Sequence, residues 1–448
     1  MRIINVKDMG LEAVEKLLKK PAFDQVELNP RIREANKKLF GADLTAAEIV
    51  DRIVGDVRRD GDEAVIKYTK LIDRTEFKPE EFVVTEAEYE AAYQEADPAV
   101  VESLRKAAEN VRRYHQEQKP NSWMTYRDKG SILGQSVIPL DRVGIYVPGG
   151  TAAYPSSVIM NAMPAVVAGV KEIIMMVPPK NGKINPYVLV AAKEAGVSKI
   201  FKIGGAQAIA AMAFGTETIP RVDKITGPGN IFVTLAKKAV YGHCDIDMLA
   251  GPSEILIVAD KTADPAYTAA DMLSQAEHDM LASSIVITDS PELAEKVAAE
   301  AEKQLKVLPR EEITRASLDR NGMIIITEDI MQAVGLANVS APEHMEVLTE
   351  QPFQLLPYIR HAGAVFLGAY ASEPLGDYFA GPNHVLPTNG TAKFFSPLSV
   401  DDFVKKSSII YYSREALAPI HKDIEAFAAS EHLTAHANSI HVRFEDED

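Results

Sequence analysis

The sequence contains a single cysteine, Cys244, among 448 residues. A disulfide within the chain is therefore impossible, and so is a zinc site built from several cysteines. A lone thiol can act as a nucleophile towards an aldehyde, but a single cysteine is more often a small buried hydrophobic residue. We therefore expect Cys244 to be buried and chemically inert.

Long apolar runs and positive charge are also scarce. No run reaches the roughly 18 apolar residues that a membrane span needs, and the first residues lack the apolar region of a secretory signal. A formal charge of -16 argues against a nucleic-acid surface, because phosphate binding needs clustered Lys and Arg. These absences predict a cytoplasmic enzyme or binding protein for a small molecule, with no nucleic-acid or membrane partner.

The first third of the chain shows helical periodicity. Asp97 can cap a helix that has Pro98 at its first position and apolar residues on one stripe as far as His115. The stretch LTAAEIVDRIVGDVRRDGDEAVIKYTK has a similar pattern. We therefore expect this third to be largely helical.

From Asp141 onwards, short apolar runs alternate with helical patterns. The runs are RVGIYVPGG, KEIIMMVPP, SKIFKIGG, EILIVAD, SSIVITDS, NGMIIITED and AGAVFLGAY. Helices with cap signals separate several of them, at Asn185-Pro186 and at Asp264-Pro265. Strand, helix and strand in succession predict parallel sheets and an α/β fold with two modules.

The order of these patterns suggests how the modules are connected. We expect one module, residues 146–254, to be inserted into another that is made of residues 43–145 and 255–398. The first 42 residues would form a helical arm. Residues 399–448, which include DDFVKKSSII, would form a helical tail that is too short for a core of its own.

Three glycine clusters follow strand-like runs, in GIYVPGG, IGGAQ and TGPGN. Glycine permits close approach of the backbone to a phosphate, and the N-terminus of a following helix favours negative charge. None of the clusters matches the G-x-G-x-x-G dinucleotide fingerprint. Ordinary tight turns are an equally simple reading of them.

Polar residues gather in several short blocks. Gln275 and His278 in SQAEHDM are three positions apart, so that on a helix both project from one face. Glu343 and His344 are adjacent in APEHME and offer a carboxylate and an imidazole for acid–base chemistry near neutrality. Each block can also be read as satisfied buried polar residues or as a solvated loop. Gln275, His278, Asp377 and His436 would make a nitrogen and oxygen set that suits zinc, but only the first two are linked by spacing.

Taken in order, these blocks resemble the histidinol dehydrogenase family from about residue 45 to residue 442. The matching stretches are GIYVPGG, GGAQAIAAMAFGTE, VDKITGPGN, DMLAGPSE, LSQAEHD, APEHME, GAYASEPLGDYFAGPNHVLPT, FSPLSVDDFVK and EHLTAHANS. The resemblance implies oxidation of L-histidinol through L-histidinaldehyde to L-histidine, with NAD and Zn2+ as cofactors. It also implies two incomplete Rossmann-like domains and an intertwined homodimer, in which the tail completes the site of the partner subunit.

The resemblance assigns roles to individual residues. The implied catalytic pair is Glu343 and His344. The implied zinc ligands are Gln275, His278, Asp377 and His436. These four ligands and His344 would contact the substrate together with Ser253, His384 and Glu431, and NAD would contact Tyr146, Gln207 and Asn230.

Two other functions fit parts of the pattern. A related zinc- and NAD-dependent dehydrogenase of another polar alcohol, such as a sulfonated diol, would not need Glu431 or His384 to hold an amine or an imidazole. A two-lobed binding protein without catalysis would not need the Glu343-His344 pair. We therefore expect an oxidoreductase of histidine biosynthesis.

Overall fold

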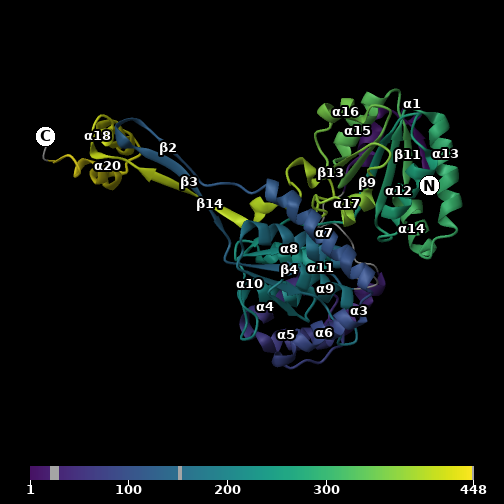
Figure 1. Cartoon of the computed structure of the whole chain (residues 1–448), viewed down its shortest axis with the longest axis horizontal. Coiled ribbons are helices and arrows are strands. Elements are labelled where there is room, and N and C mark those ends of the chain that lie inside the picture. The colour runs from purple at the N-terminus through teal and green to yellow at the C-terminus, as the bar shows by residue number, and fades with distance from the viewer. Residues whose placement is uncertain (21–29, 150–153, 446–448) are drawn as a thin grey trace. The chain divides into compact units, whose positions relative to one another are not determined.

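The computed structural model describes residues 1–20, 30–149 and 154–445. The chain divides into two compact units. The first contains Met1–Gln118 and Leu140–Phe403, and the second contains Lys119–Pro139 and Val404–Asp448 (Figure 1). No helix among the described residues is both long enough and apolar enough to cross a membrane.

A six-stranded sheet in the first unit has the order β1-β11-β10-β9-β12-β13, and all its neighbouring strands are parallel. Its strands are β1 (Arg2–Asn5), β9 (Glu254–Ala259), β10 (Ser283–Thr288), β11 (Met323–Ile326), β12 (His344–Leu348) and β13 (Ala364–Leu367). Its helices are α1 (Val6–Met9), α2 (Leu11–Leu18), α12 (Pro265–Ala276), α13 (Pro291–Leu305), α14 (Glu311–Asn321), α15 (Ile330–Ser340), α16 (Pro352–Leu355) and α17 (Glu373–Tyr378).

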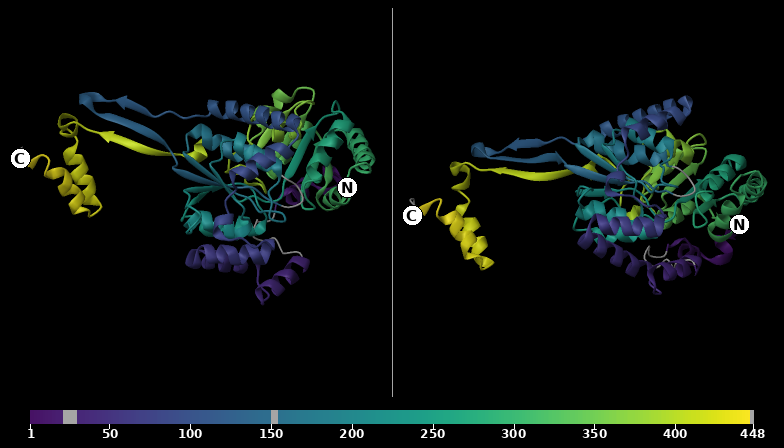
Figure 2. Two further views of the ribbon diagram at one scale, coloured as in Figure 1. Left: turned by 60° about the horizontal axis from the view of Figure 1, so that its bottom comes forward. Right: turned by 90° about the horizontal axis from the view of Figure 1, so that it is seen from below.

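Helices cover both faces of this sheet (Figure 2). Alternate residues of β9 explain this, because Leu256 and Val258 pack in one core cluster while Ile255 and Ile257 pack in another. A strand that is apolar on both faces is stable only between two layers of helices. The parallel α/β arrangement predicted from the apolar runs is therefore confirmed.

A five-stranded sheet, also in the first unit, has the order β6-β5-β4-β7-β8 and is again parallel throughout. Its strands are β4 (Arg142–Tyr146), β5 (Glu172–Met176), β6 (Lys199–Phe201), β7 (Lys224–Thr226) and β8 (Asp245–Ile246). Its connecting helices are α8 (Pro155–Ala168), α9 (Pro186–Glu194), α10 (Gly205–Phe214) and α11 (Ile231–Val240). Because β4 begins at Arg142, the predicted module boundary after residue 145 falls inside a strand.

The helices that precede this sheet pack against it, which corrects the predicted partition. They are α3 (Pro30–Phe40), α4 (Ala46–Asp60), α5 (Asp62–Tyr68), α6 (Glu86–Glu95) and α7 (Pro98–Glu117). Ile49, Ile53 and Val57 of α4 share a core cluster with Ile174 of β5 and Ile209 of α10. Residues 43–118 were expected to join the strands that follow residue 254, but an amphipathic stripe predicts burial without naming the partner.

Local signals predicted the starts of several helices correctly. Asp97, Asn185 and Asp264 each cap a helix through their side chains, and a proline follows each of them at the first helical position. On α7 the predicted stripe is buried at Leu104 and Val111, although its ends, Val100 and Tyr114, are exposed.

The N-terminal segment was expected to be a helical arm, but it begins with strand β1, at the edge of the six-stranded sheet. Residues 21–29 of that predicted arm lie outside the described residues. The strand is short and pairs with β11, far along the chain, so a local pattern could not identify it.

The second unit contains a three-stranded antiparallel sheet, β14-β3-β2. Its strands are β2 (Trp123–Tyr126), β3 (Ile132–Pro139) and β14 (Val404–Tyr411), and its helices are α18 (Arg414–Leu417), α19 (His421–Ser430) and α20 (Thr434–His441). The prediction of a helix over DDFVKKSSII was wrong, because residues 404–411 pair with β3 along its full length. Residues 446–448 of the predicted tail lie outside the described residues.

Candidate active site

His344, one of the polar residues singled out from the sequence, lies on β12 and shares one face of this strand with Glu346. Met345 and Val347 of this strand point into an apolar core, and the alternate residues His344 and Glu346 face α12 and α17. All five residues of β12 are buried. A buried strand with ionisable residues at every second position is costly unless each has a partner, which marks this face as a functional site.

Gln275 and His278 come from the C-terminal end of α12. The sequence suggested that both residues lie on the helix. The helix ends at Ala276, however, so His278 lies in the following turn. The backbone N–H of His278 donates to the carbonyl of Gln275 at 3.2 Å, which keeps both residues within one turn. Gln275 is fully buried, and neither polar atom of its carboxamide has a hydrogen-bond partner among the described residues.

Asp377 lies on α17 at the centre of the cluster. Its Oδ1 atom is 3.6 Å from Nε2 of His344 and 3.6 Å from Nδ1 of His384. One ligand atom from each of His278, Glu373 and Asp377 lies within 4.8 Å of the others, which makes this group a candidate metal site. Burial opposes ionisation of Asp377, but the imidazoles of His384 and His344 outweigh it and hold the pKa of this carboxyl well below its usual range.

Glu343 and His344 are both buried and both bonded to the backbone of Glu254. The Glu254 N–H donates to Oε2 of Glu343 at 2.9 Å. Nδ1 of His344 is 3.1 Å from the Glu254 carbonyl oxygen, so Nδ1 donates, and Nε2 faces Asp377. In its neutral form the ring would therefore present an unprotonated Nε2 to the cluster, whereas in its charged form Nε2 also donates.

Burial and mutual attraction shift the pKa of both members of this pair. Burial raises the pKa of Glu343 to about 8, against the opposing effect of His344. Burial lowers the pKa of His344, but the carboxyls of Glu343 and Asp377 outweigh it and raise the pKa to about 10. Both groups are thus tuned by their surroundings, as acid–base residues are.

Sequence reasoning missed Glu373. It is buried in the first turn of α17, accepts a hydrogen bond from the Ser274 hydroxyl at 3.1 Å, and donates its backbone N–H to Oε1 of Glu346 at 2.8 Å. Burial, reinforced by Asp377, raises the pKa of Glu373 to about 8. The signal that could have found it is its i,i+4 spacing from Asp377, which places both carboxyls on one helix face.

Ser253 and His384 are the other predicted substrate-site residues that lie in the first unit. Ser253 directly precedes Glu254 and is half-buried. His384 is bonded through Nδ1 to the Asp377 carbonyl at 3.0 Å. The other two predicted site residues, Glu431 and His436, lie in the second unit, where both are exposed.

The predicted cofactor residues lie at the carboxyl ends of strands in the five-stranded sheet. Tyr146 ends β4, and its hydroxyl accepts a hydrogen bond from the Gly205 N–H at 3.1 Å. Gln207 follows on α10 and donates through Nε2 to Asp73 at 3.2 Å. Both side chains are buried, whereas Asn230 is exposed and caps α11 through the backbone N–H groups of Phe232 and Val233.

Asp73 is a second residue that the sequence did not reveal, and burial raises the pKa of its carboxyl to about 6. The turn after β7 is also tightly built. Gly227 has a φ of +115°, and its Cα lies against the carbonyl of Tyr146, where a side chain would collide. Gly150, which ends the motif GIYVPGG, lies outside the described residues.

Cys244 belongs to an apolar core. It is 7% exposed and belongs to the core cluster of the five-stranded sheet. Burial raises the pKa of its thiol to about 12, so the nucleophilic thiolate is disfavoured. The expectation that Cys244 is a buried hydrophobic residue is confirmed.

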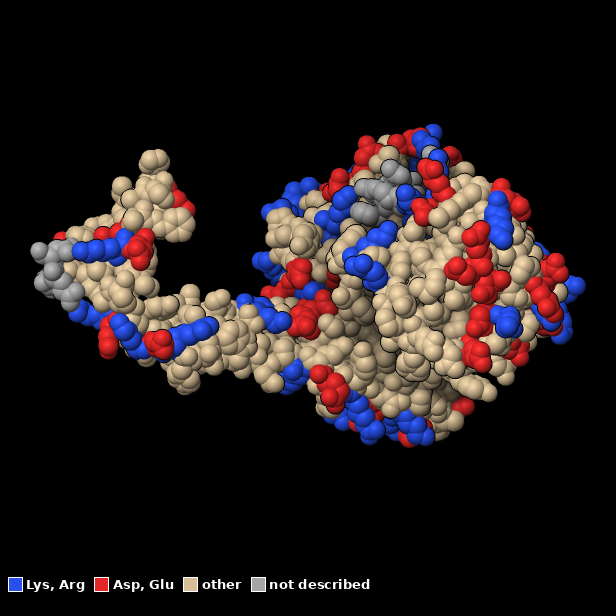
Figure 3. Space-filling view, turned by 90° about the horizontal axis from the view of Figure 1, so that it is seen from above, with Lys and Arg blue, Asp and Glu red and all other residues tan. Residues whose placement is uncertain are grey.

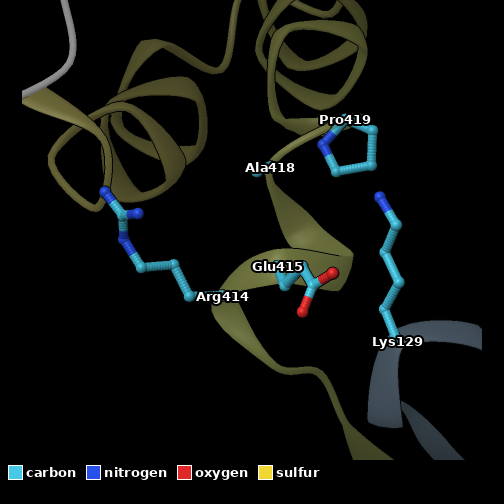
Figure 4. A pocket seen from close by; sticks show the side chains of 5 residues that line it. All are labelled: Lys129, Arg414, Glu415, Ala418 and Pro419. Atoms are coloured by element: carbon cyan, nitrogen blue, oxygen red, sulfur yellow. The ribbon is translucent and has the colours of Figure 1, made fainter.

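A hollow in the second unit has a different character. It is lined by Lys129, Arg414, Glu415, Ala418 and Pro419, and Figure 4 shows the Glu415 carboxylate among these side chains. The Ser413 hydroxyl donates to the Lys129 carbonyl at 2.6 Å and so ties the two segments of this unit together. The hollow contains none of the residues that the sequence singled out.

Charged side chains of both signs lie on the surface of the molecule. On the face that Figure 3 shows, basic and acidic side chains are interspersed.

The fold and the site together define an α/β enzyme with a buried glutamate–histidine pair beside a candidate metal centre. A family model described as histidinol dehydrogenase matches residues 37–444. The chain belongs to the histidinol dehydrogenase family.

Individual relatives agree with this assignment. The chain is 57% identical to a histidinol dehydrogenase of Halalkalibacterium halodurans over 399 residues, which cover 89% of this chain and 94% of the relative. It is 56% identical to that of Bacillus subtilis over 395 residues, with 88% and 92% covered. The crystal structure of histidinol dehydrogenase from Elizabethkingia anophelis superimposes with a TM-score of 0.90 at 35% identity, covering 100% of this chain and 98% of that one.

Proposed function

We propose that this enzyme oxidises L-histidinol through L-histidinaldehyde to L-histidine with NAD, which is the last step of histidine biosynthesis. The observation that carries the proposal is the buried Glu343-His344 pair, in which Nε2 of His344 lies 3.6 Å from Oδ1 of Asp377 in the candidate metal centre. The relatives' names support the substrate, and they do not favour a related dehydrogenase of another polar alcohol.

The donor atoms fit zinc. Gln275 has a buried carboxamide without a partner, which is costly unless something binds it. An imidazole from His278 and a carboxylate from Asp377 are ligands that zinc accepts. We propose that Gln275, His278, Asp377 and His436 hold the ion, which when bound supplies a Lewis acid that anchors the amine and imidazole of histidinol.

Within this site, His344 is suited to accept the alcohol proton. Its Nδ1 donates to the Glu254 carbonyl, which fixes the tautomer and leaves Nε2 as the accepting atom. Burial lowers the pKa of His344, but the charges of Glu343 and, after it, Asp377 raise it, so the ring binds a proton readily.

Glu343 is suited to the second step, in which water adds to the aldehyde. Its carboxyl titrates near neutrality because burial raises the pKa to about 8. The hydrogen bond from Glu254 holds one oxygen, Oε2, and leaves the other for a water proton. NAD, which Tyr146, Gln207 and Asn230 would hold, would supply the hydride acceptor for both oxidations.

The site for NAD is proposed at Tyr146, Gln207 and Asn230. Support comes from their place at the carboxyl ends of parallel strands, where open α/β sheets usually bind ligands. The glycine-rich turns at Gly205 and Gly227 permit close approach of a phosphate.

We also propose an intertwined homodimer in which Glu431 and His436 serve the site of the partner subunit, where Glu431 would help to line the substrate pocket. The support is that α19 and α20 contain no buried residue, so they have apolar surface that needs a partner. A tail with so little core of its own is not expected to be stable alone.

The test is the stoichiometry of the reaction. Histidinol should yield about two NADH for each molecule consumed, because the aldehyde is oxidised before release. NADH absorbance and histidine production are measured on limiting histidinol. A yield near one, with free aldehyde accumulating, would count against the proposed sequence of steps.

A further inference from the structure

Glu254 is a buried acidic residue at the start of β9. Its side chain is 4% exposed and pairs with Lys20, whose Nζ atom is 2.9 Å from Oε2. The other oxygen, Oε1, accepts a hydrogen bond from the Asn389 N–H at 2.7 Å. Both oxygens of this carboxylate are therefore held.

The backbone of the same residue holds the reactive pair. As described above, its N–H binds Oε2 of Glu343 and its carbonyl binds Nδ1 of His344. The position of both side chains thus depends on the two peptide planes that flank the Glu254 Cα atom. Fixing the Glu254 carboxylate restrains these planes, because they share that Cα atom.

The sheet by itself holds this end of β9 on one side only. Glu254 pairs with Ser283 of β10, but the pairing with β12 begins one residue later, between Ile255 and His344. The bonds to Glu343 and His344 take the place of the missing ladder contacts. Lys20 adds a link across the sheet, because it also donates to the Ser283 hydroxyl at 3.3 Å.

Lys20 is itself anchored. It follows α2, whose residues Val14 and Leu18 are buried in the core beneath the six-stranded sheet. The Lys20 side chain is only 19% exposed, so the ion pair is largely shielded from water. Removing one partner of such a pair leaves an uncompensated buried charge, which disturbs its surroundings more than removing both.

We propose that Lys20 and Glu254 are positioning residues that hold Glu343 and His344 in their reactive geometry. The inference rests on the proposed function, in which those two residues are the acid–base pair. It extends the catalytic scaffold to the N-terminal segment, whose described residues include none of the proposed site residues. A displacement of about 1 Å at a reacting group can lower a rate by up to about 100-fold.

The experiment compares Lys20→Met, Lys20→Arg and the double variant Lys20→Met/Glu254→Gln in the zinc-loaded enzyme. We expect Lys20→Met to lower kcat about 10- to 100-fold, with the KM for histidinol and the zinc content close to those of the wild type. Lys20→Arg keeps the charge and should keep kcat within about threefold of the wild type. The double variant removes both charges, and its kcat should lie between those of Lys20→Met and the wild type.

A matched control is available in the five-stranded sheet. Arg142 and Glu172 also join neighbouring parallel strands at 2.6 Å, but they do not contact the acid–base pair. Arg142→Met should leave kcat unchanged after correction for the folded fraction. A loss of kcat in Lys20→Met that is fully explained by its unfolded or zinc-free fraction overturns the proposal, and so does an unchanged kcat.

Two further measurements keep the result decisive. If Lys20→Met does not fold, the double variant decides, because a wild-type kcat there shows that the ion pair is not needed. Crystal structures of the wild type and the variant test the geometry without catalysis, since the distance of 2.9 Å from Glu254 N to Glu343 Oε2 should lengthen only in the variant. If histidinol yields no NADH with the wild type, the proposed function fails, and the crystals still decide whether Lys20 positions Glu343.

Discussion

At the scale of single residues, the chemistry of Glu343 depends on its burial. A carboxyl on the surface would be ionised at neutral pH, whereas here burial raises the pKa to about 8. The protonated and ionised forms are then both accessible, which suits a group that must take a proton from water and return it.

Glu343→Gln should therefore separate the two oxidations. The amide can still accept the Glu254 N–H but cannot take a proton, so oxidation of histidinaldehyde should fall by about 100-fold or more. Oxidation of histidinol to the aldehyde should fall much less, because His344 is the proposed acceptor of that proton. Presenting each substrate separately and following NADH measures both steps.

Cys244→Ala is the control for this experiment, since the thiol is buried in another core and should not form a covalent intermediate. It should keep most of the activity. A loss that matches that of Glu343→Gln would show instead that the thiol attacks the aldehyde.

His278→Ala should lose both zinc and activity. It removes one of the proposed ligands and leaves the others too few to hold the ion tightly. Metal analysis of the purified variant is the measurement, with the exposed His243→Ala as the control. Full zinc occupancy in His278→Ala would remove this histidine from the proposed ligand set.

The residues of the site differ in how far the sequence revealed them. The spacing of Gln275 and His278 predicted one shared helix face, but α12 ends at Ala276 and His278 lies in the turn that follows. Asp377, His344 and His384 are distant along the chain, and only the family resemblance brought them together before the structure did. The role of Glu254 was not predicted, because it contacts the site through its backbone N–H and carbonyl. Nearly every residue has these groups, so the sequence does not distinguish them.

At the scale of elements, features that depend on local signals were predicted correctly, whereas features that depend on distant partners were missed. Capping residues act on the helix that they begin, so the starts of α7, α9 and α12 could be read from the sequence. Strands β1 and β14 depend on partners far along the chain, and both were missed. For the same reason, the sequence-based partition assigned α4 and α5 to the wrong sheet.

Helix α4 carries a charge cluster that should make stability depend on pH. Asp56 accepts hydrogen bonds from Tyr68 at 2.7 Å and from Lys67 at 2.9 Å. Burial opposes ionisation, but these bonds and that from Arg59 outweigh it and hold the pKa of Asp56 well below its usual range. A depressed pKa contributes stability above the unfolded value near pH 4, and this contribution is lost as the pH falls further.

Asp56→Asn should therefore lower the free energy of unfolding by about 1–3 kcal/mol at pH 7 and by less at pH 3.5. Urea unfolding followed by circular dichroism at the two pH values measures the difference. Asp51→Asn, on an exposed position of the same helix, should change stability by no more than about 0.5 kcal/mol. An equal effect of Asp56→Asn at both pH values would contradict the assignment.

At the scale of the whole molecule, the proposed site combines two chains. Asp377→Ala lies in the first unit and His436→Ala in the second, and each variant alone should be inactive. In a mixed dimer, one site receives both changes and the other receives neither. Random reassortment makes about half of the dimers mixed, so roughly a quarter of wild-type sites should return.

The two variants must be unfolded and refolded together, because an intertwined dimer should exchange subunits slowly. Activity and zinc content of the refolded mixture are compared with refolded wild type. If the mixture stays inactive while each variant remains dimeric and the wild type recovers, the tail serves its own chain.

The three-stranded sheet of the second unit also constrains how the protein is made. Strand β3 lies between β2, its neighbour in sequence, and β14, which begins only at Val404. On the ribosome, residues 140–403 must be synthesised before β14 emerges, at about 5–20 residues per second. Until then β2 and β3 form at most an isolated hairpin, which is marginally stable in water. The nascent chain therefore carries an open strand edge for many seconds, which makes residues 119–139 a segment for chaperones to shield.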